Sequence, residues 1–559
     1  MFSSITISLT SQFLIACSVA GEPYDAWVAE PAPALNALPA TTGTSLTAEE
    51  LAAIAKSSPT PPYTGFTAGV RAPDGAIWIG TPQGLLYRSG DGAPWRVFHS
   101  RHWLPDREVR GVALASDGSV LVETPKGIGR LAKRRTTLDE KMAEIRRRLR
   151  QYHIREGLIG EIQLKEPGRV DAGWSLSSSD NDGLWTSLYV AAEAYRYGVT
   201  GDEEAKRNAR QSLDALLFLE KVTGISGFAA RSIWPAGEGV DANKMFGGEW
   251  HLSADKRWWW KGDTSSDELD GHYFAYAVYY DLCADEREKE EIRAVVARIT
   301  DHIIDHGYYY VGPPGRPTTW GVWAPEKLNR DLKWILDRGL NSLEILSHLK
   351  VAEHMTGSAR YKDAAHELIE KHSYATNTVD QKVVWPVREV NHSDDELAFL
   401  AYYPLLWYER DPELRKYYLT SIERSWQIER PERSPLFNFI YAAARQANTW
   451  TDPTKRPEAA RVEPGDYDRD ELTEWFREVP ADTIKWRVTN SDRQDLGDLV
   501  TNRFRQRRTR HVLPVSERHI MRWNGDPYEL DGGGDGHERD DGTFILLPYW
   551  MGRYHRLID

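Results

Sequence analysis

Residues 265–280 read SSDELDGHYFAYAVYY, an acidic first turn followed by a run of aromatic and small apolar residues. The same texture returns at five other places, which read DNDGLWTSLY from Asp180, DRGLNSLEIL from Asp337, HSDDELAFLAYYPLLWY from His392, RSPLFNFIYAAA from Arg433 and DDGTFILLPYWMGRY from Asp540. A helix that is apolar nearly all round must be buried. We therefore expect these segments to form an inner layer of helices whose polar first turns open onto one shared space.

Amphipathic segments alternate with the apolar ones. They read GDEEAKRNARQSLDALLFLEKV from Gly201, DEREKEEIRAVVARITDHI from Asp285, SARYKDAAHELIEKH from Ser358 and DPELRKYYLTSIERSW from Asp411. Each has apolar residues at helical spacing and a charged opposite face, as expected of an outer layer. The pattern alternates a buried helix, a tight turn and a surface helix. It predicts a mainly α fold, with an (α/α) toroid over residues 170–559.

On these segments the chain resembles, over roughly residues 140–559, the (α/α) barrel carbohydrate-active enzymes. That group includes glycosidases and polysaccharide lyases. The resemblance implies a sugar-binding cleft at one end of the inner helices. It is a resemblance of fold, and a fold does not fix the chemistry.

The N-terminal region has a different composition. Residues 1–20 contain a short apolar stretch and predict an export signal, with a lipobox that would lipidate Cys17 as the alternative. Either version predicts a periplasmic, extracellular or surface-anchored protein. Residues 21–62 are rich in Ala, Pro and Thr and predict a tether, apart from a short helix capped by Thr47 with Glu50.

An internal repeat follows the tether. VRAPDGAIWIGTPQGLLYRS from Val70 and VALASDGSVLVETPKGIGRL from Val112 each contain two apolar strands around an Asp-Gly turn. Both copies resemble blades of two-component-regulator propellers. Two blades cannot close a propeller ring, so residues 63–132 predict a small β appendage. The charged stretch 133–169 predicts a linking helix.

The net charge and the aromatic content indicate which kinds of partner the protein binds. The 559 residues carry a formal charge of −13 without a basic stripe, which argues against nucleic acid as a partner. The chain has 22 Trp and 26 Tyr, and aromatic rings cover the apolar faces of sugars. We therefore expect a poly- or oligosaccharide as substrate, and membrane contact only through an N-terminal lipid.

The densest set of ionisable residues lies at the start of the 265–280 segment. Asp267 and Asp270 share one helix face, and Glu268 and His272 share the adjoining face. Clustered, dehydrated acids raise one another's pKa, which can keep a carboxyl protonated as a general acid. Helix capping by Ser266 or Asp267 is the competing interpretation.

Two further clusters lie at equivalent positions of other helices. Asp395 and His392 belong to the 392–408 segment, where Ser393 and Glu396 also have the spacing of a capping box. Asp182 and Trp185 fall on one face of another helix, and a carboxylate beside an indole ring suits a sugar subsite. The remaining predicted substrate-binding residues are Trp260, Glu268, Tyr273, Arg338, Asn341, His392, Asn438 and Tyr549.

Three functions compete on this pattern. Glycoside hydrolysis needs two carboxyl groups, which we expect to be Asp267 or Asp270 paired with Asp182 or Asp395. A polysaccharide lyase would instead use His272 or His392 with Tyr273 as base, and Arg338 with Asn341 to neutralise a uronate carboxylate. The third hypothesis is a glycan-binding protein without catalytic activity. The abundance of acids favours hydrolysis, because binding alone gives no reason to dehydrate them.

No cofactor is expected from the motifs. The segment DGGGDGHERDD from Asp531 offers oxygen ligands for Ca²⁺, with Asp531 and Asp535 first among them. It lacks the bidentate Glu of an EF-hand, so a glycine-rich loop leading into the last helix is the preferred interpretation. The region before it, from about residue 449, predicts a wall of the cleft, with Trp486, Arg487, Asn490 and Asp492 facing the substrate.

Overall fold

The computed structural model describes residues 21–32, 35, 37–239, 241, 244–245, 247–382, 391–447, 456, 468–501 and 507–559. The predicted export signal, with Cys17, lies outside these residues. Among the residues described, no helix is both long enough and apolar enough to cross a membrane. The chain is mainly helical, with several small sheets.

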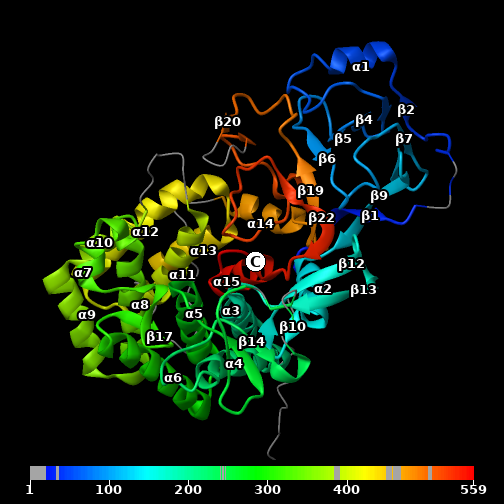
Figure 1. Ribbon diagram of the computed structural model, residues 1–559. Coiled ribbons are helices and arrows are strands. Elements are labelled where there is room, and N and C mark those ends of the chain that lie inside the picture. Colours follow the sequence, from blue (N-terminus) through cyan, green and yellow to red (C-terminus); the bar gives the residue numbers. More distant parts are fainter. Residues whose placement is uncertain are drawn as a thin grey trace, which may run out of the picture.

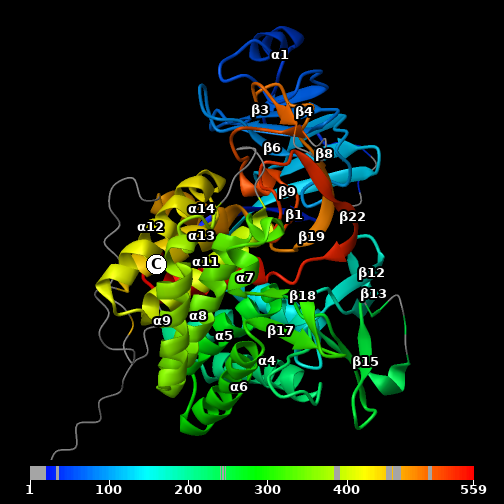
Figure 2. The ribbon, with the colours of Figure 1, turned by 60° about the vertical axis from the view of Figure 1, so that its left-hand side comes forward.

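The aromatic segments form helices that are buried along nearly their whole length. They are α3 (Asp182–Thr200), α5 (Ser266–Leu282), α8 (Arg338–Thr356), α11 (His392–Tyr408), α13 (Pro435–Gln446) and α15 (Thr543–Tyr554). Each contacts the next in this order, and α15 contacts α3, so the contacts form a closed cycle. Figures 1 and 2 show these helices gathered side by side.

Amphipathic helices lie outside this cycle. They are α2 (Leu138–Tyr152), α4 (Glu203–Lys221), α6 (Glu286–Asp305), α9 (Ala359–His372), α12 (Pro412–Glu429) and α14 (Arg469–Glu478). Within the stretch expected to be a linking helix, α2 packs against α15, and strands follow it. The apolar faces of inner and outer helices share one continuous core.

Two glycines let α3 and α5 approach closely. A Cβ atom added at Gly183 would collide with the carboxylate of Glu268, and one at Gly271 would lie 2.8 Å from Cδ1 of Leu184. At each glycine, the backbone of one helix therefore packs directly against a side chain of the other helix. This close packing brings the first turns of α3 and α5 together.

The N-terminal repeats form two antiparallel sheets that share a core. The sheet order is β2-β3-β4-β5-β6 in one and β1-β9-β8-β7 in the other. Val70 and Trp78 of the first sheet pack in one cluster with Val122 and Leu131 of the second, because two blades must cover each other's apolar faces. The strands are β2 (Thr44–Ser45), β3 (Ala68–Arg71), β4 (Ile77–Thr81), β5 (Gly84–Arg88), β6 (Arg96–Phe98), β7 (Gly111–Leu114), β8 (Val120–Thr124) and β9 (Gly127–Thr136).

Part of the expected tether is built into this appendage. Strand β1 (Tyr24–Glu30) pairs antiparallel with β9 along its full length. Trp27 of β1 packs edge-on against Trp78, and this partly buried ring helps to hold the strand in place. Helix α1 (Ala48–Ile54) begins with the capping box between Thr47 and Glu50.

A third sheet lies between the appendage and the helices (Figure 1). It has the order β13-β12-β22-β19, so residues 161–177 pair with the C-terminal region. The strands are β12 (Glu161–Glu166), β13 (Arg169–Ser177), β19 (Ile484–Thr489) and β22 (Asp531–Arg539). The glycine-rich segment at Asp531 is thus a strand that leads directly into α15.

The remaining elements are short and connect the helices. They are β10 (Ile154–Arg155), β11 (Leu158–Ile159), β14 (Ile233–Pro235), β15 (Trp250–Leu252), β16 (Trp258–Lys261), β17 (Tyr309–Gly312), β18 (Arg316–Val322), α7 (Pro325–Leu328), α10 (Tyr374–Thr378), β20 (Val500–Thr501), β21 (Arg507–Arg508) and the 3-10 turns Ala236–Glu238, Leu332–Trp334, Arg430–Glu432 and Val515–Glu517.

Candidate functional site

The first turns of α5 and α11 carry acids that do not cap their helices. The N-cap residues are Ser265 and Asn391, and neither makes a side-chain capping hydrogen bond. Ser393 therefore lies inside α11, and the capping box with Glu396 does not form. The acids of both first turns are free for other contacts.

Asp267 lies half-buried at the start of α5. Burial raises its pKa, and the charge of Asp180 adds to the effect while Arg231 opposes it. The Nδ2 atom of Asn181 donates to Asp267 at 3.4 Å, and Oδ1 of Asn181 accepts from Arg231 at 2.6 Å. Arg231 and Lys261 both pair with Asp180, at 2.8 Å each. A charged network from the α3 side thus holds Asp267 in place.

Asp394 lies in the first turn of α11, and the charge of Asp267 acts on it. We call the region around these two carboxyl groups the acidic space. Asp394 is half-buried, and burial raises its pKa to about 7, with the charges of Asp337 and Asp267 contributing. Glu396, fully buried beside it, has its pKa raised to about 8 by burial, an effect that Arg522 opposes. Since Asp267 raises the pKa of both acids, the carboxyl groups of α5 and α11 lie within electrostatic reach of each other.

The other predicted acids have internal partners. Asp182 is completely buried: its Oδ2 accepts from Arg155 at 2.7 Å, and its Oδ1 accepts from the Ser179 backbone at 2.6 Å. Ser232 also donates to Oδ2. The carboxylate therefore joins the start of α3 to neighbouring loops and faces no solvent.

Asp270 lies one turn deeper than Asp267. Its Oδ1 contacts Nε2 of His348 at 2.7 Å, and its carboxyl group hydrogen-bonds Glu344. Glu344 in turn accepts from Nε1 of Trp323 at 2.7 Å. Burial raises the pKa of Asp270 and Glu344 well above the usual range, so this pair keeps a proton inside the core.

Glu268 and His272 also belong to the interior. Both are fully buried, and their side chains lie 3.4 Å apart. Glu268 accepts from the Leu184 amide at 3.1 Å, and His272 contacts the Tyr276 hydroxyl at 3.3 Å. The hydrogen bond of Glu268 joins α5 to α3, and the contact of His272 lies within α5.

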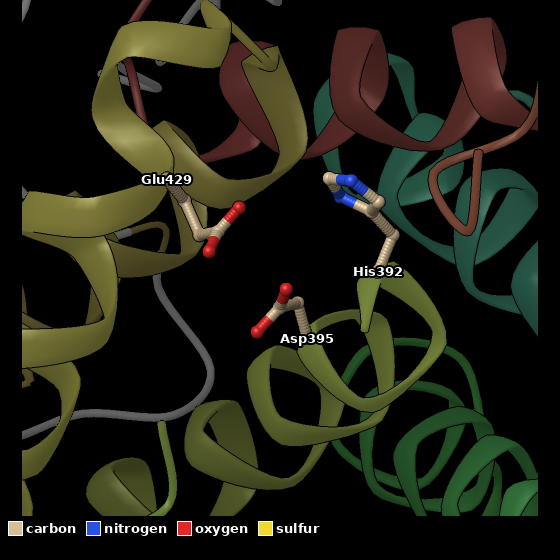
Figure 3. Close-up of side chains that lie close together, drawn as sticks. All are labelled: His392, Asp395 and Glu429. Carbon is tan, nitrogen blue, oxygen red and sulfur yellow. The ribbon is translucent and has the colours of Figure 1, made fainter. Parts of the chain in front are cut away.

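Asp395, the next residue of α11, belongs to a charged cluster between α11 and α12. Figure 3 shows Asp395 with His392 and Glu429, whose potential ligand atoms all lie within 4.8 Å of one another. Three such groups could hold a metal ion. The ammonium of Lys382, however, pairs with both Asp395 and Glu429 and supplies a positive charge there. Burial opposes that charge, but the two carboxylates outweigh it and raise the pKa of Lys382.

The predicted aromatic and polar binding residues are mostly buried. The guanidinium of Arg522 covers the ring of Trp185 at 4.1 Å, and Trp260 stacks on His251. The remaining internal contacts are Tyr273 with Thr300, Asn341 with the Val322 carbonyl, His392 with Glu432, Asn438 with Trp426 and Tyr549 with Asp139. Arg338 differs, because it is only half-buried, in the first turn of α8.

The predicted calcium ligands have protein partners. The Oδ1 atom of Asp531 accepts from the amides of Asn490 and Ser491 at 2.9 and 3.0 Å. Asp535 contacts Nδ1 of His537 at 2.8 Å on the exposed side of β22.

An exposed apolar patch lies immediately before α8. Trp320 is 54% exposed, and Leu332, Ile335 and Leu336 are exposed just ahead of Asp337. The rings of Trp320 and Trp334 lie 6.5 Å apart. Because Asp337 is one of the charges that raise the pKa of Asp394, the patch flanks the acidic space.

Asp394, Glu396 and Trp320 are not among the site residues predicted from the sequence. Asp394 and Glu396 lie in the acidic start of the 392–408 segment, but the directions in which their side chains point depend on where α11 begins. Trp320 follows two Thr residues in β18, and only its exposure distinguishes it from the many buried tryptophans.

No family model matches the chain, and no curated protein matches it. A solved structure that matches is a zinc-binding triple mutant of a glycoside hydrolase family 9 endoglucanase, with 13% identity and a TM-score of 0.35. The match covers 86% of this chain and 98% of that chain.

Proposed function

We propose that this protein is an exported glycoside hydrolase of the (α/α) toroid type that cleaves a poly- or oligosaccharide. The observation that carries the proposal is the pair formed by Asp267 and Asp394. These half-buried acids come from different helices, have raised pKa values and interact electrostatically with each other. Two carboxyl groups in different protonation states are what glycosidic bond cleavage requires.

We assign the two roles from the charges around each acid: Arg231 favours the charged form of Asp267, whereas Asp337 and Asp267 favour the protonated form of Asp394. Asp394, with a pKa of about 7, donates its proton to the glycosidic oxygen as the C–O bond breaks. Asp267 is the carboxylate that takes a proton from water, and that water's oxygen bonds to the anomeric carbon. The products are a new reducing end and a free hydroxyl. Return of a proton from Asp267 to Asp394 through solvent restores the starting state.

Other groups support this assignment. The contacts of Asn181 and Arg231 orient Asp267, and Trp320 offers an exposed ring for an apolar sugar face. The residues of the lyase alternative, His272 or His392 with Tyr273, are all buried and in contact with other side chains. This placement weighs against elimination and favours hydrolysis.

The experiment is incubation of the purified protein with a panel of neutral and uronate-bearing polysaccharides. Reducing ends and the absorbance of unsaturated products are followed together. Hydrolysis predicts reducing ends without the unsaturated chromophore, and the Asp267→Asn variant should produce neither. Appearance of the chromophore would mean a lyase, and binding without products would mean a glycan-binding protein.

A further inference from the structure

A cleft of about 490 Å³ lies between the β appendage and strand β19, apart from the acidic space of the helices. It is lined by Gln83, His99, Arg101, Asp106, Arg107, Arg487 and Thr489. The residues come from the turn after β4, the connection between the two blades and β19. Segments far apart in the sequence therefore build this cleft.

Three arginines of the lining make the cleft rich in positive charge. Arg101, Arg107 and Arg487 are exposed, and no carboxylate of the described residues pairs with them. Arg101 lies over the ring of Trp486 at 4.2 Å, which holds its guanidinium in place. Asp106 is the acid in the lining, and Lys126 neutralises it at 3.1 Å. An anionic ligand would meet three guanidinium groups here.

Two residues of the lining, His99 and Gln83, each have a buried side-chain atom with no hydrogen-bond partner among the described residues. His99 is 6% exposed, and its Nε2 lies 2.8 Å from Oδ1 of Asn490. The Nδ2 of Asn490 donates to the Glu517 carbonyl, so Oδ1 is its acceptor and Nε2 of His99 must carry the proton. Burial lowers the pKa of His99 to about 4, which leaves the ring neutral and Nδ1 an unpaired acceptor.

The Oε1 atom of Gln83 is also buried, and none of the residues described in the structure forms a hydrogen bond with it. Buried polar atoms are normally paired, so two unpaired acceptors call for ligand donors. Hydroxyl groups provide such donors, and a simple inorganic anion does not.

We propose that this cleft binds an acidic saccharide, with its carboxylate or sulfate group on the three arginines and its hydroxyl groups donating to His99 and Gln83. The site goes beyond the proposed hydrolase function and does not depend on it. It would hold an anionic part of a glycan on the appendage while the helices act on another part.

The test is calorimetric titration of the full chain with trigalacturonate, with neutral cellotriose and with sodium sulfate. Trigalacturonate should bind, and cellotriose should not. The double variant Arg107→Gln/Arg487→Gln should weaken binding at least about tenfold, because two charge-assisted contacts are lost. Arg169→Gln, an exposed arginine of β13 paired with Glu166 and Asp171, is the matched control and should bind as the wild type does.

The other outcomes overturn the proposal. Equal binding of cellotriose, or no binding of trigalacturonate, removes the acidic saccharide. Sulfate that binds as tightly as trigalacturonate reduces the cleft to a simple anion site. The titration is repeated on Asp267→Asn, which should bind unchanged, so failure of this site and failure of the hydrolase proposal are distinguishable.

Discussion

Asp394 and Asp395 are neighbours in sequence but belong to different environments. Successive residues of a helix point about 100° apart, so the two side chains leave α11 in different directions. Asp394 enters the half-buried acidic space and keeps a proton near neutral pH, whereas Asp395 enters the core and pairs with Lys382. Asp267 and Asp270 of α5 differ in the same way. The difference separates acids that can meet a substrate from acids that hold the fold together.

The largest expected effect is on turnover. Asp267→Asn should lower kcat by about 10²–10⁴-fold, because the base that activates water is lost, while oligosaccharide binding is retained. Asp270→Asn is the matched control and should change kcat less than about tenfold. Steady-state kinetics and equilibrium binding measure both, and equal loss of kcat in the two variants would contradict the division of roles.

Asp394→Asn should abolish turnover of natural glycosides but spare an aryl glycoside whose leaving group needs no proton. The wild-type pH profile should fall as pH rises through about 7, where Asp394 loses its proton, and fall again in acid as Asp267 gains one. The alkaline limb should be absent for the variant on the aryl substrate. Persistence of that limb would assign it to another group, with Glu396 first.

Removing the core cation tests the other half of the comparison. Lys382→Met should lower the free energy of unfolding by about 3–5 kcal/mol, because Asp395 and Glu429 are left as buried acids without a counter-charge. Lys416→Met, which removes an exposed pairing with Glu413, should change it by less than about 1 kcal/mol. Urea unfolding at neutral pH measures both variants, and similar values would mean that the core cluster is not stabilised by Lys382.

A smaller loss is expected where α3 meets α5. Gly183→Ala should destabilise the protein by about 1–3 kcal/mol, because the added methyl group collides with Glu268 and overpacks the interface. Gly237→Ala, where nothing lies within 4 Å of the added atom, is the control and should be close to neutral. Thermal unfolding of the two variants gives the comparison, and a stable Gly183→Ala protein would show that the helices can separate at little cost.

The smallest effect concerns stability against pH. The pKa of Asp394 is raised in the folded protein, so its contribution to stability is present below the unfolded pKa and is lost as pH rises through about 7. The Asp394→Asn variant does not lose stability in this way, because Asn does not titrate. Its Tm should exceed that of the wild type by at most a few degrees above pH 7, and the difference should vanish in acid. Scanning calorimetry across this pH range checks the sign.

Sequence periodicity located the six helices of the contact cycle, because an all-round apolar helix has no stable place except the interior. The segments at 180, 265, 337, 392, 433 and 540 all became helices of the contact cycle. The Asp-Gly turns likewise predicted the two hairpin repeats. Strand β1 was not predicted, since its pairing with β9 depends on residues about a hundred positions away.

The sequence alone thus determined which segments are buried and that their polar starts are rich in acids, since both properties depend on residue type and local spacing. Only the tertiary structure decided which acid does what. One step along a helix separates Asp394 from Asp395, and whether a carboxyl group meets a lysine, a histidine or open space depends on the neighbouring helix. Partners supplied by distant segments set the pKa of each acid, and local sequence does not contain them.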